Sequence, residues 1–227
     1  MTRQSHLELA PVLRSLISNK SVVFDIGSHA GQFTKLFARL SPDGMVYAFE
    51  PSSYARSILS ISLSPHRMKN VQVVPAAVGD TPGTLPLTSP VKPRGSVRFG
   101  LAHLGGNSTV RGHTESVPVL TLDEFSDEYR VHDLDFLKAD IEGWEMRALL
   151  GGKNTIKRHR PTMYLELINS HLARAGDSLH EAWELLLSWD YRPLEWTSGT
   201  KLQLLETPRD GDAFWIPSEH NVTLKST

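Results

Sequence analysis

Short apolar runs alternate with segments of helical periodicity along most of this chain. The β-branched run at 22–24 ends at Asp25 and is followed by helical spacing at 32–40; a second strand at 45–49 and a second helix at 53–63 repeat the pattern. Buried parallel strands are continuous apolar runs, and the helices that join them cover both faces of their sheet. The alternation predicts an α/β fold, a three-layer sandwich around a mostly parallel sheet.

The order of these segments also predicts the domain organisation. The chain has 227 residues, enough for one domain with a substantial core. We expect an N-terminal helix within 1–20, a single domain over 21–217 and a tail at 218–227. The segment 81–112 is rich in Gly, Pro, Ser and Thr, which predicts an inserted loop or hairpin near 81–118 that lies over the site.

Composition argues against several classes of protein. The chain has no cysteine, so disulfides, thiolate zinc sites and cysteine nucleophiles are excluded. Its net charge of −1 argues against a nucleic-acid or membrane-surface binder. It shows no signal peptide, and no apolar run is long enough to span a bilayer. We expect a soluble cytoplasmic protein, able to form a homo-oligomer, whose partner is a small molecule.

The strongest local signal is the loop Asp-Ile-Gly-Ser-His-Ala-Gly-Gln-Phe-Thr that starts at Asp25. Gly27 allows a sharp turn after the strand, and Gly31 lets the next helix pack closely and leaves room for a ligand. The third glycine of a pyrophosphate-binding Gly-x-Gly-x-x-Gly is absent. A carboxylate at Asp25 would repel phosphate but can hold the ammonium end of a methionine moiety. The loop therefore favours S-adenosylmethionine over NAD, the alternative being an ordinary strand-to-helix turn.

Polar and small residues follow the next two predicted strands. Glu50 can accept hydrogen bonds from both hydroxyls of a ribose, unless Glu50 and Pro51 merely end the strand. Ala77 and Val78 can flank an adenine ring, and Asp80 can reach its amino group. Ligands of open α/β sheets bind at the carboxyl ends of the strands, so we expect these residues to share one site.

Taken together, these segments resemble the FkbM family of class I methyltransferases. The most family-specific piece is Asp-Ile-Glu-Gly at 140–143 with Glu145 after it, whereas the glycine loop occurs in many methyltransferases. The family usually has Ala-Asn where this chain has Ser28-His29, and 82–112 matches nothing in it. The matching segments are Phe24–Thr34, Val46–Pro51, Ala76–Asp80, Leu120–Asp123, Phe136–Glu145 and Pro161–Leu167.

The resemblance implies a Rossmann-like class I fold with a mostly parallel seven-stranded sheet. It also implies S-adenosylmethionine-dependent O-methyl transfer, commonly to a hydroxyl of a sugar, or of a glycosylated natural product or lipid. The cofactor-binding residues that follow from it are Asp25, Gly27, Ser28, Gly31, Phe33, Glu50, Pro51, Ala77, Val78 and Asp80.

The catalytic candidates come from the second half of the chain. Asp140 ends a core strand, where it can stand near the transferred methyl group, and Glu142 lies in the loop that follows. His171 and His113 are candidate general bases, since a neutral imidazole titrates near working pH. Asp140 and Glu142 can alternatively cap the helix expected to start near Gly143.

A magnesium ion is a further expectation at the same strand ends. Asp140, Glu166 and Asn169 carry oxygen ligands of the kind that Mg²⁺ prefers. A bound metal would lower the pKa of the acceptor hydroxyl. The alternative is that Glu166 is a structural carboxylate.

Four other functions stay open. The acceptor could be a non-sugar small molecule of polyketide type. An NAD-dependent oxidoreductase is disfavoured by the glycine loop. A nucleic-acid methyltransferase is disfavoured by the charge balance and by the absence of an Asn/Asp-Pro-Pro-Tyr/Phe sequence. A cofactor-binding fold without catalysis is distinguishable by activity alone.

Overall fold

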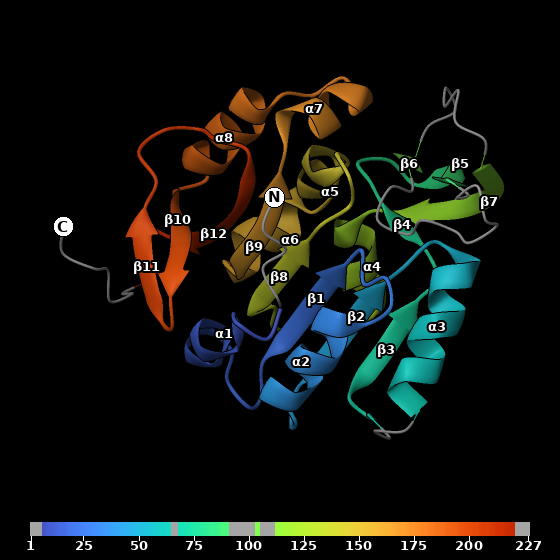
Figure 1. Ribbon diagram of the computed structural model, residues 1–227, viewed down its shortest axis with the longest axis horizontal. Helices are drawn as coiled ribbons and strands as arrows, with labels where there is room; N and C mark the ends of the chain where they lie inside the picture. Colours follow the sequence, from blue (N-terminus) through green and yellow to red (C-terminus); the bar gives the residue numbers. More distant parts are fainter. Residues whose placement is uncertain (1–5, 65–67, 91–102, 105–111, 221–227) are drawn as a thin grey trace.

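The computed structural model describes most of the chain (Figure 1). No helix in this described part is long and apolar enough to cross a bilayer. The expected domain limits stay predictions, and parts of the N-terminal segment, the insertion and the tail fall outside the described residues. The described residues are 6–64, 68–90, 103–104 and 112–220.

The main sheet has eight strands, in the order β11-β10-β12-β9-β8-β1-β2-β3. The neighbouring strands from β3 to β9 pair in parallel, whereas β12, β10 and β11 pair antiparallel to their neighbours. The strands are β1 (Val22–Ile26), β2 (Met45–Phe49), β3 (Val71–Val74), β8 (Phe136–Ala139), β9 (Thr162–Leu167), β10 (Tyr191–Ser198), β11 (Lys201–Leu204) and β12 (Gly211–Pro217).

The class I α/β fold is thus confirmed, but the expected count of seven strands is wrong. The additional strand is β11, which continues from β10 as an antiparallel hairpin. Its alternation covers four residues, of which only Leu202 is buried. So short an edge strand has little apolar pattern to reveal it.

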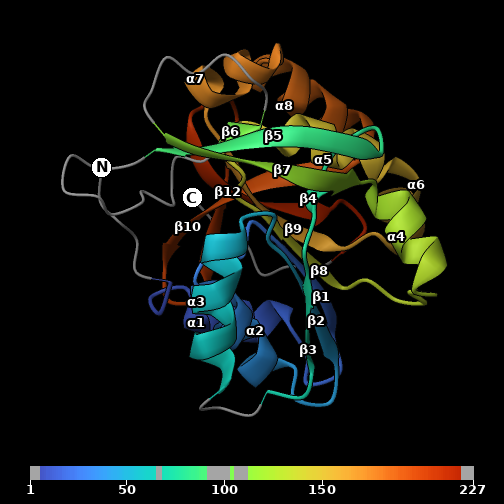
Figure 2. The same cartoon turned by 90° about the vertical axis from the view of Figure 1, so that its right-hand side faces the viewer.

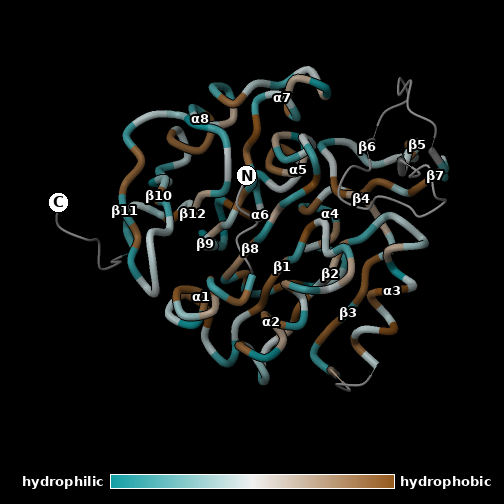
Figure 3. Tube along the Cα trace, in the orientation of Figure 1, coloured by the Kyte–Doolittle hydropathy of each residue, from teal (hydrophilic) through white to brown (hydrophobic). Residues whose placement is uncertain are grey.

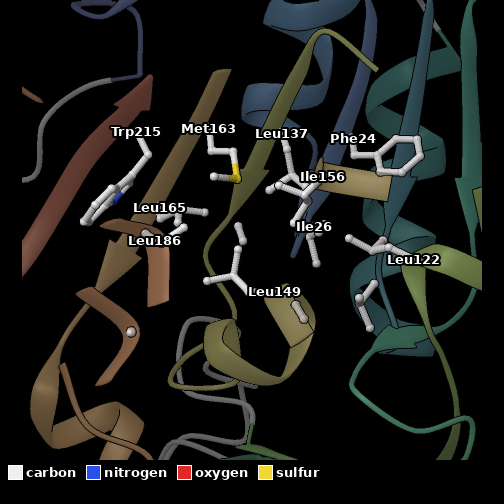
Figure 4. Close-up of a cluster of buried hydrophobic side chains, with 14 of the residues drawn as sticks. Phe24, Ile26, Leu122, Leu137, Leu149, Ile156, Met163, Leu165, Leu186 and Trp215 are labelled. Atoms are coloured by element: carbon white, nitrogen blue, oxygen red, sulfur yellow. The ribbon is translucent and has the colours of Figure 1, made fainter. Parts of the chain in front are cut away.

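Helices cover both faces of this sheet. Along β1, Val23 belongs to the cluster formed with α1 and α2, whereas Phe24 and Ile26 belong to the cluster formed with α4, α5, α6 and α8 (Figure 4). Apolar and polar stretches are interleaved along α2, as expected for a helix with one face on the core (Figure 3). The helices are α1 (Ala10–Leu16), α2 (Gln32–Leu40), α3 (Ser53–Leu63), α4 (Leu122–Glu128), α5 (Glu145–Gly151), α6 (Lys153–His159), α7 (Asn169–Leu172) and α8 (Leu179–Ser188).

A second sheet of four strands, ordered β4-β7-β5-β6, stands at the carboxyl ends of the parallel strands (Figure 2). Its long strands pair as an antiparallel ladder within the segment where an insertion was expected. Leu87, Val117 and Val119 are buried against Ala77 and anchor this ladder. The strands are β4 (Ala77–Val78), β5 (Gly83–Pro90), β6 (His103–Leu104) and β7 (Gly112–Leu120).

The strand order reverses beside β1. The chain runs outward from β1 through β2 to β3, and then returns to place β8 on the other side of β1. The loops that leave β1 and β8 consequently diverge, which opens a crevice at this edge of the sheet. Asp25 of β1 is the register partner of Lys138 of β8, and both side chains are buried near the ends of these two strands.

The packing of the sheet face that α4 covers can be tested at a cluster of aromatic side chains. The ring of Phe125 lies within 4.9–5.7 Å of the ring centroids of Phe24, Tyr47 and Phe49. We expect Phe125→Ala to lower the free energy of unfolding by about 3–5 kcal/mol, because it removes buried area and leaves a cavity. Leu187→Ala, at a side chain that is 40% exposed, is the control. Equal losses in urea denaturation would contradict this account.

Candidate functional site

A cleft opens at the carboxyl ends of β1, β2, β3 and β8. Its empty volume, open solvent at the mouth included, is about 580 Å³. Leu87 of β5 contributes to the wall, so the second sheet borders the cleft. The lining residues are Ile26, Gly27, His29, Phe49, Glu50, Pro51, Ser52, Ala55, Ala76, Ala77, Val78, Leu87, Asp140, Ile141 and Glu142.

The loop after β1 turns where only glycine fits. Gly27 has φ 75°, and a Cβ atom there would lie 2.1 Å from the backbone oxygen of Asp140. At Gly31, φ is 80° and a Cβ would lie 2.4 Å from the Leu59 side chain of α3. Gly31 therefore serves helix packing, whereas Gly27 lets the loops after β1 and β8 touch.

The carboxylate of Glu50 is fixed by backbone groups on both oxygens. Oε2 accepts from the His29 N–H at 2.9 Å, and Oε1 accepts from the Ser52 N–H at 2.8 Å. His29 adopts φ 47°, a left-handed conformation in which histidine is enriched among non-glycine residues. The unassigned residue His29 thus lines the cleft and orients Glu50 through its backbone.

Asp25 and Lys138 form a buried pair beneath the glycine loop. Asp25 is 0% exposed and accepts from the Thr34 hydroxyl at 2.5 Å, while its other oxygen lies 3.7 Å from the Lys138 ammonium. Lys138 donates to the Gly27 carbonyl at 3.0 Å. Burial raises the pKa of the Asp25 carboxyl, and the Lys138 ammonium opposes that rise.

The loop after β8 brings Asp140 and Glu142 to the opposite wall of the cleft. Glu142 has φ 58° and Gly143 has φ 104°, and a Cβ at Gly143 would lie 2.2 Å from the backbone oxygen of His171. The loop therefore presses against α7, which places His171 Nδ1 at 3.4 Å from Glu142 Oε2. Glu145 holds the loop from behind, since its Oε1 accepts from the Ile141 N–H at 2.8 Å.

Carboxyl groups crowd this edge of the sheet and share a low-dielectric environment. Burial, reinforced by the charge of Asp140, raises the pKa of Glu142 to about 7. Burial likewise raises the pKa of Glu145 to about 7, although the Ile141 N–H opposes the rise. Burial and the neighbouring Asp140 and Asp212 raise the pKa of Glu166 to about 8. Protons are therefore held here near neutral pH.

The structure gathers half of the predicted cofactor residues in the cleft. Gly27, Glu50, Pro51, Ala77 and Val78 line it. The other five lie behind or beside it, and their roles at the cofactor stay predictions.

Those five residues make contacts of other kinds. Asp25 faces Thr34 and Lys138, Ser28 is buried beside β2, and Phe33 packs on Phe37 and Tyr164. Gly31 contacts α3. Asp80 accepts from Arg147 at 3.0 Å.

The catalytic candidates separate in the same way. Asp140 and Glu142 line the cleft, and His171 contacts Glu142 behind that wall. His113 is exposed on β7 and is not among the lining residues.

The predicted metal ligands Asp140, Glu166 and Asn169 come from two neighbouring strand ends. The side-chain oxygen of Asn169 accepts from the Leu179 N–H at 3.0 Å. Within the described residues, no group of three His, Asp or Glu side chains is arranged to hold a metal ion. A site made of two acids and an amide lies outside that set, so the predicted ligands and the magnesium requirement both stay predictions.

Sequence reasoning assigned no role to Lys138 or Glu145. Both stand inside the segment that resembles the FkbM family, and both are buried, at 2% and 1% exposure. A charged residue at a position that the pattern of β8 makes interior was the available signal for Lys138. Glu145 carried a weaker signal, because an acid in the first turn of a helix is common.

The raised pKa of Glu166 predicts a pH-dependent stability. Between pH 4.5 and about 8 the unfolded chain loses this proton while the native state keeps it, so the free energy of unfolding falls as pH rises through that window. We expect Glu166→Gln to flatten this fall, making the variant progressively more stable than wild type toward pH 8 in urea titrations. Glu184→Gln, an exposed change on α8, should leave the slope unchanged. An unaltered slope in Glu166→Gln would contradict the shift.

Known proteins resemble this chain in sequence and in fold. The Methyltransferase FkbM domain model matches residues 25–193. A 2-O-methyltransferase NoeI of Sinorhizobium fredii (strain NBRC 101917 / NGR234) is 25% identical over 178 residues, which are 74% of this chain and 72% of that protein.

Two solved structures share the fold. The methyltransferase FkbM from Methylobacillus flagellatus KT has a TM-score of 0.57 at 18% identity; the match covers 88% of this chain but 44% of that longer one. A protein of Streptococcus mutans solved in complex with SAH has a TM-score of 0.51 at 11% identity, with 95% and 97% of the two chains covered. The family match spans most of the chain and includes the cleft, and the chain belongs to the FkbM methyltransferase family.

Proposed function

We propose that this protein transfers a methyl group from S-adenosylmethionine to a hydroxyl oxygen of a saccharide or of a glycosylated natural product or lipid. The observation that carries the proposal is the cleft at the switch in strand order, with Glu50 fixed on one wall and Asp140 and Glu142 on the other. The family supports methyl transfer, and the 2-O-methyltransferase relative supports an oxygen as the acceptor atom.

The residues of the cleft suit the parts of S-adenosylmethionine. Each oxygen of Glu50 accepts one backbone N–H, which leaves acceptor capacity for the two hydroxyls of a ribose. Phe49, Ala77 and Val78 form an apolar wall that suits an adenine ring. The carboxylates of this edge also suit a ligand that carries positive charge.

When bound, S-adenosylmethionine supplies a methyl group activated by a sulfonium. The protein must then place the acceptor hydroxyl in line and take up its proton. We assign uptake of the proton to the Asp140 carboxylate, because it lines the cleft at the end of β8 and lies next to the Lys138 cation. Glu142 lines the same wall of the cleft and contacts His171 behind it, and these two side chains can pass the proton toward solvent.

Binding measurements test the cofactor. Calorimetry with S-adenosylmethionine, S-adenosylhomocysteine and NAD, each with and without Mg²⁺, should give micromolar binding of the first two alone. Glu50→Gln should weaken it by about 10–100-fold, because an amide NH₂ faces a backbone N–H and a charge-assisted acceptor is lost. Glu184→Gln is the matched control. Unchanged affinity in Glu50→Gln would sink the ribose assignment, NAD binding would favour an oxidoreductase, and a shift by Mg²⁺ would support a metal.

Turnover tests the chemistry. With a panel of saccharide and polyketide-type hydroxyl acceptors, we expect methyl transfer to saccharides, and Asp140→Asn should lower kcat by about 100–10,000-fold while the Kd of S-adenosylhomocysteine is retained. If Asp140→Asn keeps full activity as well as cofactor binding, Asp140 has no part in the mechanism. Transfer to the polyketide-type acceptors alone would replace the saccharide by the second acceptor class.

A further inference from the structure

Lys138 occupies an unusual position in this fold. It lies in the middle of the parallel sheet and is 2% exposed. Its ammonium donates to the Gly27 carbonyl at 3.0 Å and lies 3.7 Å from both Asp25 Oδ1 and Asp140 Oδ2. One cation thus contacts the glycine loop, a buried acid of β1 and an acid that lines the cleft.

Stability of the sheet does not account for this arrangement. A buried ion pair often contributes no more than well-packed apolar residues would, because both charges lose their hydration. The neighbouring ring of Phe33, 5.5 Å from the ammonium, could also pack against an apolar side chain. What an apolar residue could not do is hold a carboxylate at the cleft.

The three contacts fall into two groups. The Gly27 carbonyl and the buried Asp25 carboxylate fix the ammonium on one side, with Asp25 itself held by Thr34. Asp140 is the second group; its side chain is 34% exposed and lines the cleft. A side chain that is itself held rigidly can orient a second side chain at a site. Lys138 is held in this way, and Asp140 is the side chain that it can orient.

We infer that Lys138 is a positioning residue for methyl transfer, whose ammonium holds the Asp140 carboxylate in the orientation that accepts the proton of the acceptor hydroxyl. The inference rests on the proposed function. The proton passes from the acceptor oxygen to Asp140, and Lys138 gains and loses none.

The charge state of Lys138 agrees with this role. Burial alone would lower the pKa of Lys138, but the carboxylates of Asp140 and Asp25, followed by those of Asp212 and Glu166, outweigh burial and raise it. The ammonium form is therefore retained at working pH. Removal of the cation would leave Asp140 beside Asp25 with like charges and no common partner.

The first test replaces the ammonium by an apolar side chain of similar length. Lys138→Met should lower kcat by about 100-fold, the effect of a reacting group displaced by about 1 Å, while the Kd of S-adenosylhomocysteine changes far less. Lys153→Met, at an exposed lysine of α6, is the matched control. A loss confined to cofactor affinity would overturn the inference.

A second variant covers the case in which Lys138→Met does not fold, because it leaves Asp25 buried without its cation. Asp25→Asn/Lys138→Met removes both charges of the buried pair, and an amide oxygen still accepts from Thr34. We expect this double variant to recover the unfolding midpoint but not kcat. Recovery of wild-type kcat would show that Lys138 acts only through Asp25 and would overturn the inference.

A double-mutant cycle with Asp140→Asn then separates positioning from structure. If Lys138 acts through Asp140, Lys138→Met causes no further fall of kcat in the Asp140→Asn background, whereas independent effects would multiply and overturn the inference. Wild-type protein that binds no S-adenosylmethionine and transfers no methyl group would refute the proposed function itself, and the inference with it. That outcome is distinct, because it appears before any variant is made.

Discussion

The parallel pairing of β1 with β2 on one side and β8 on the other determines where the polar groups of the site lie. The Gly27 N–H donates to the Phe49 carbonyl at 3.0 Å, and the Asp140 N–H donates to the Ile26 carbonyl at 3.2 Å. These bonds continue the ladder past the ends of the strands, so the loops leave the sheet from fixed positions. Residues distant in the sequence are thereby brought to one edge.

The same pairing produces an electrostatic imbalance. Asp25, Asp140, Glu166 and Asp212 all act on the single ammonium of Lys138. Acids that outnumber their cation in a low-dielectric site stay partly protonated, as the raised pKa values of Glu166 and Asp212, about 8 and about 6, indicate. A cationic ligand would offset this crowding, and a neutral one would not. Burial of these acids lowers the free energy of unfolding, and the same excess of negative charge favours a cationic ligand in the cleft.

The sequence predicted best what depends on local pattern. The helix expected at 53–63 and the strand expected at 45–49 have those limits in the structure, because periodicity and turn residues define both. The edge strand β11 was missed because it buries a single residue. Lys138 was missed because Gly27 and Asp25, two of its three partners, come from another segment of the chain. For Asp25 the sequence could show an acid at a strand end, but not that Thr34 and Lys138 face it.

The two sheets divide the cleft between them, and this explains why resemblance to a family informs one part of the site more than another. The edge of the main sheet supplies the polar groups, whose positions depend on strand register. The second sheet supplies Leu87, which reaches the cleft from a ladder anchored on Ala77 by Val117 and Val119. That anchor is apolar, and it includes Ala77, which itself lines the cleft. Among the described residues, the segment that matched no family pattern reaches the cleft through Leu87, whereas the other lining residues come from segments outside it.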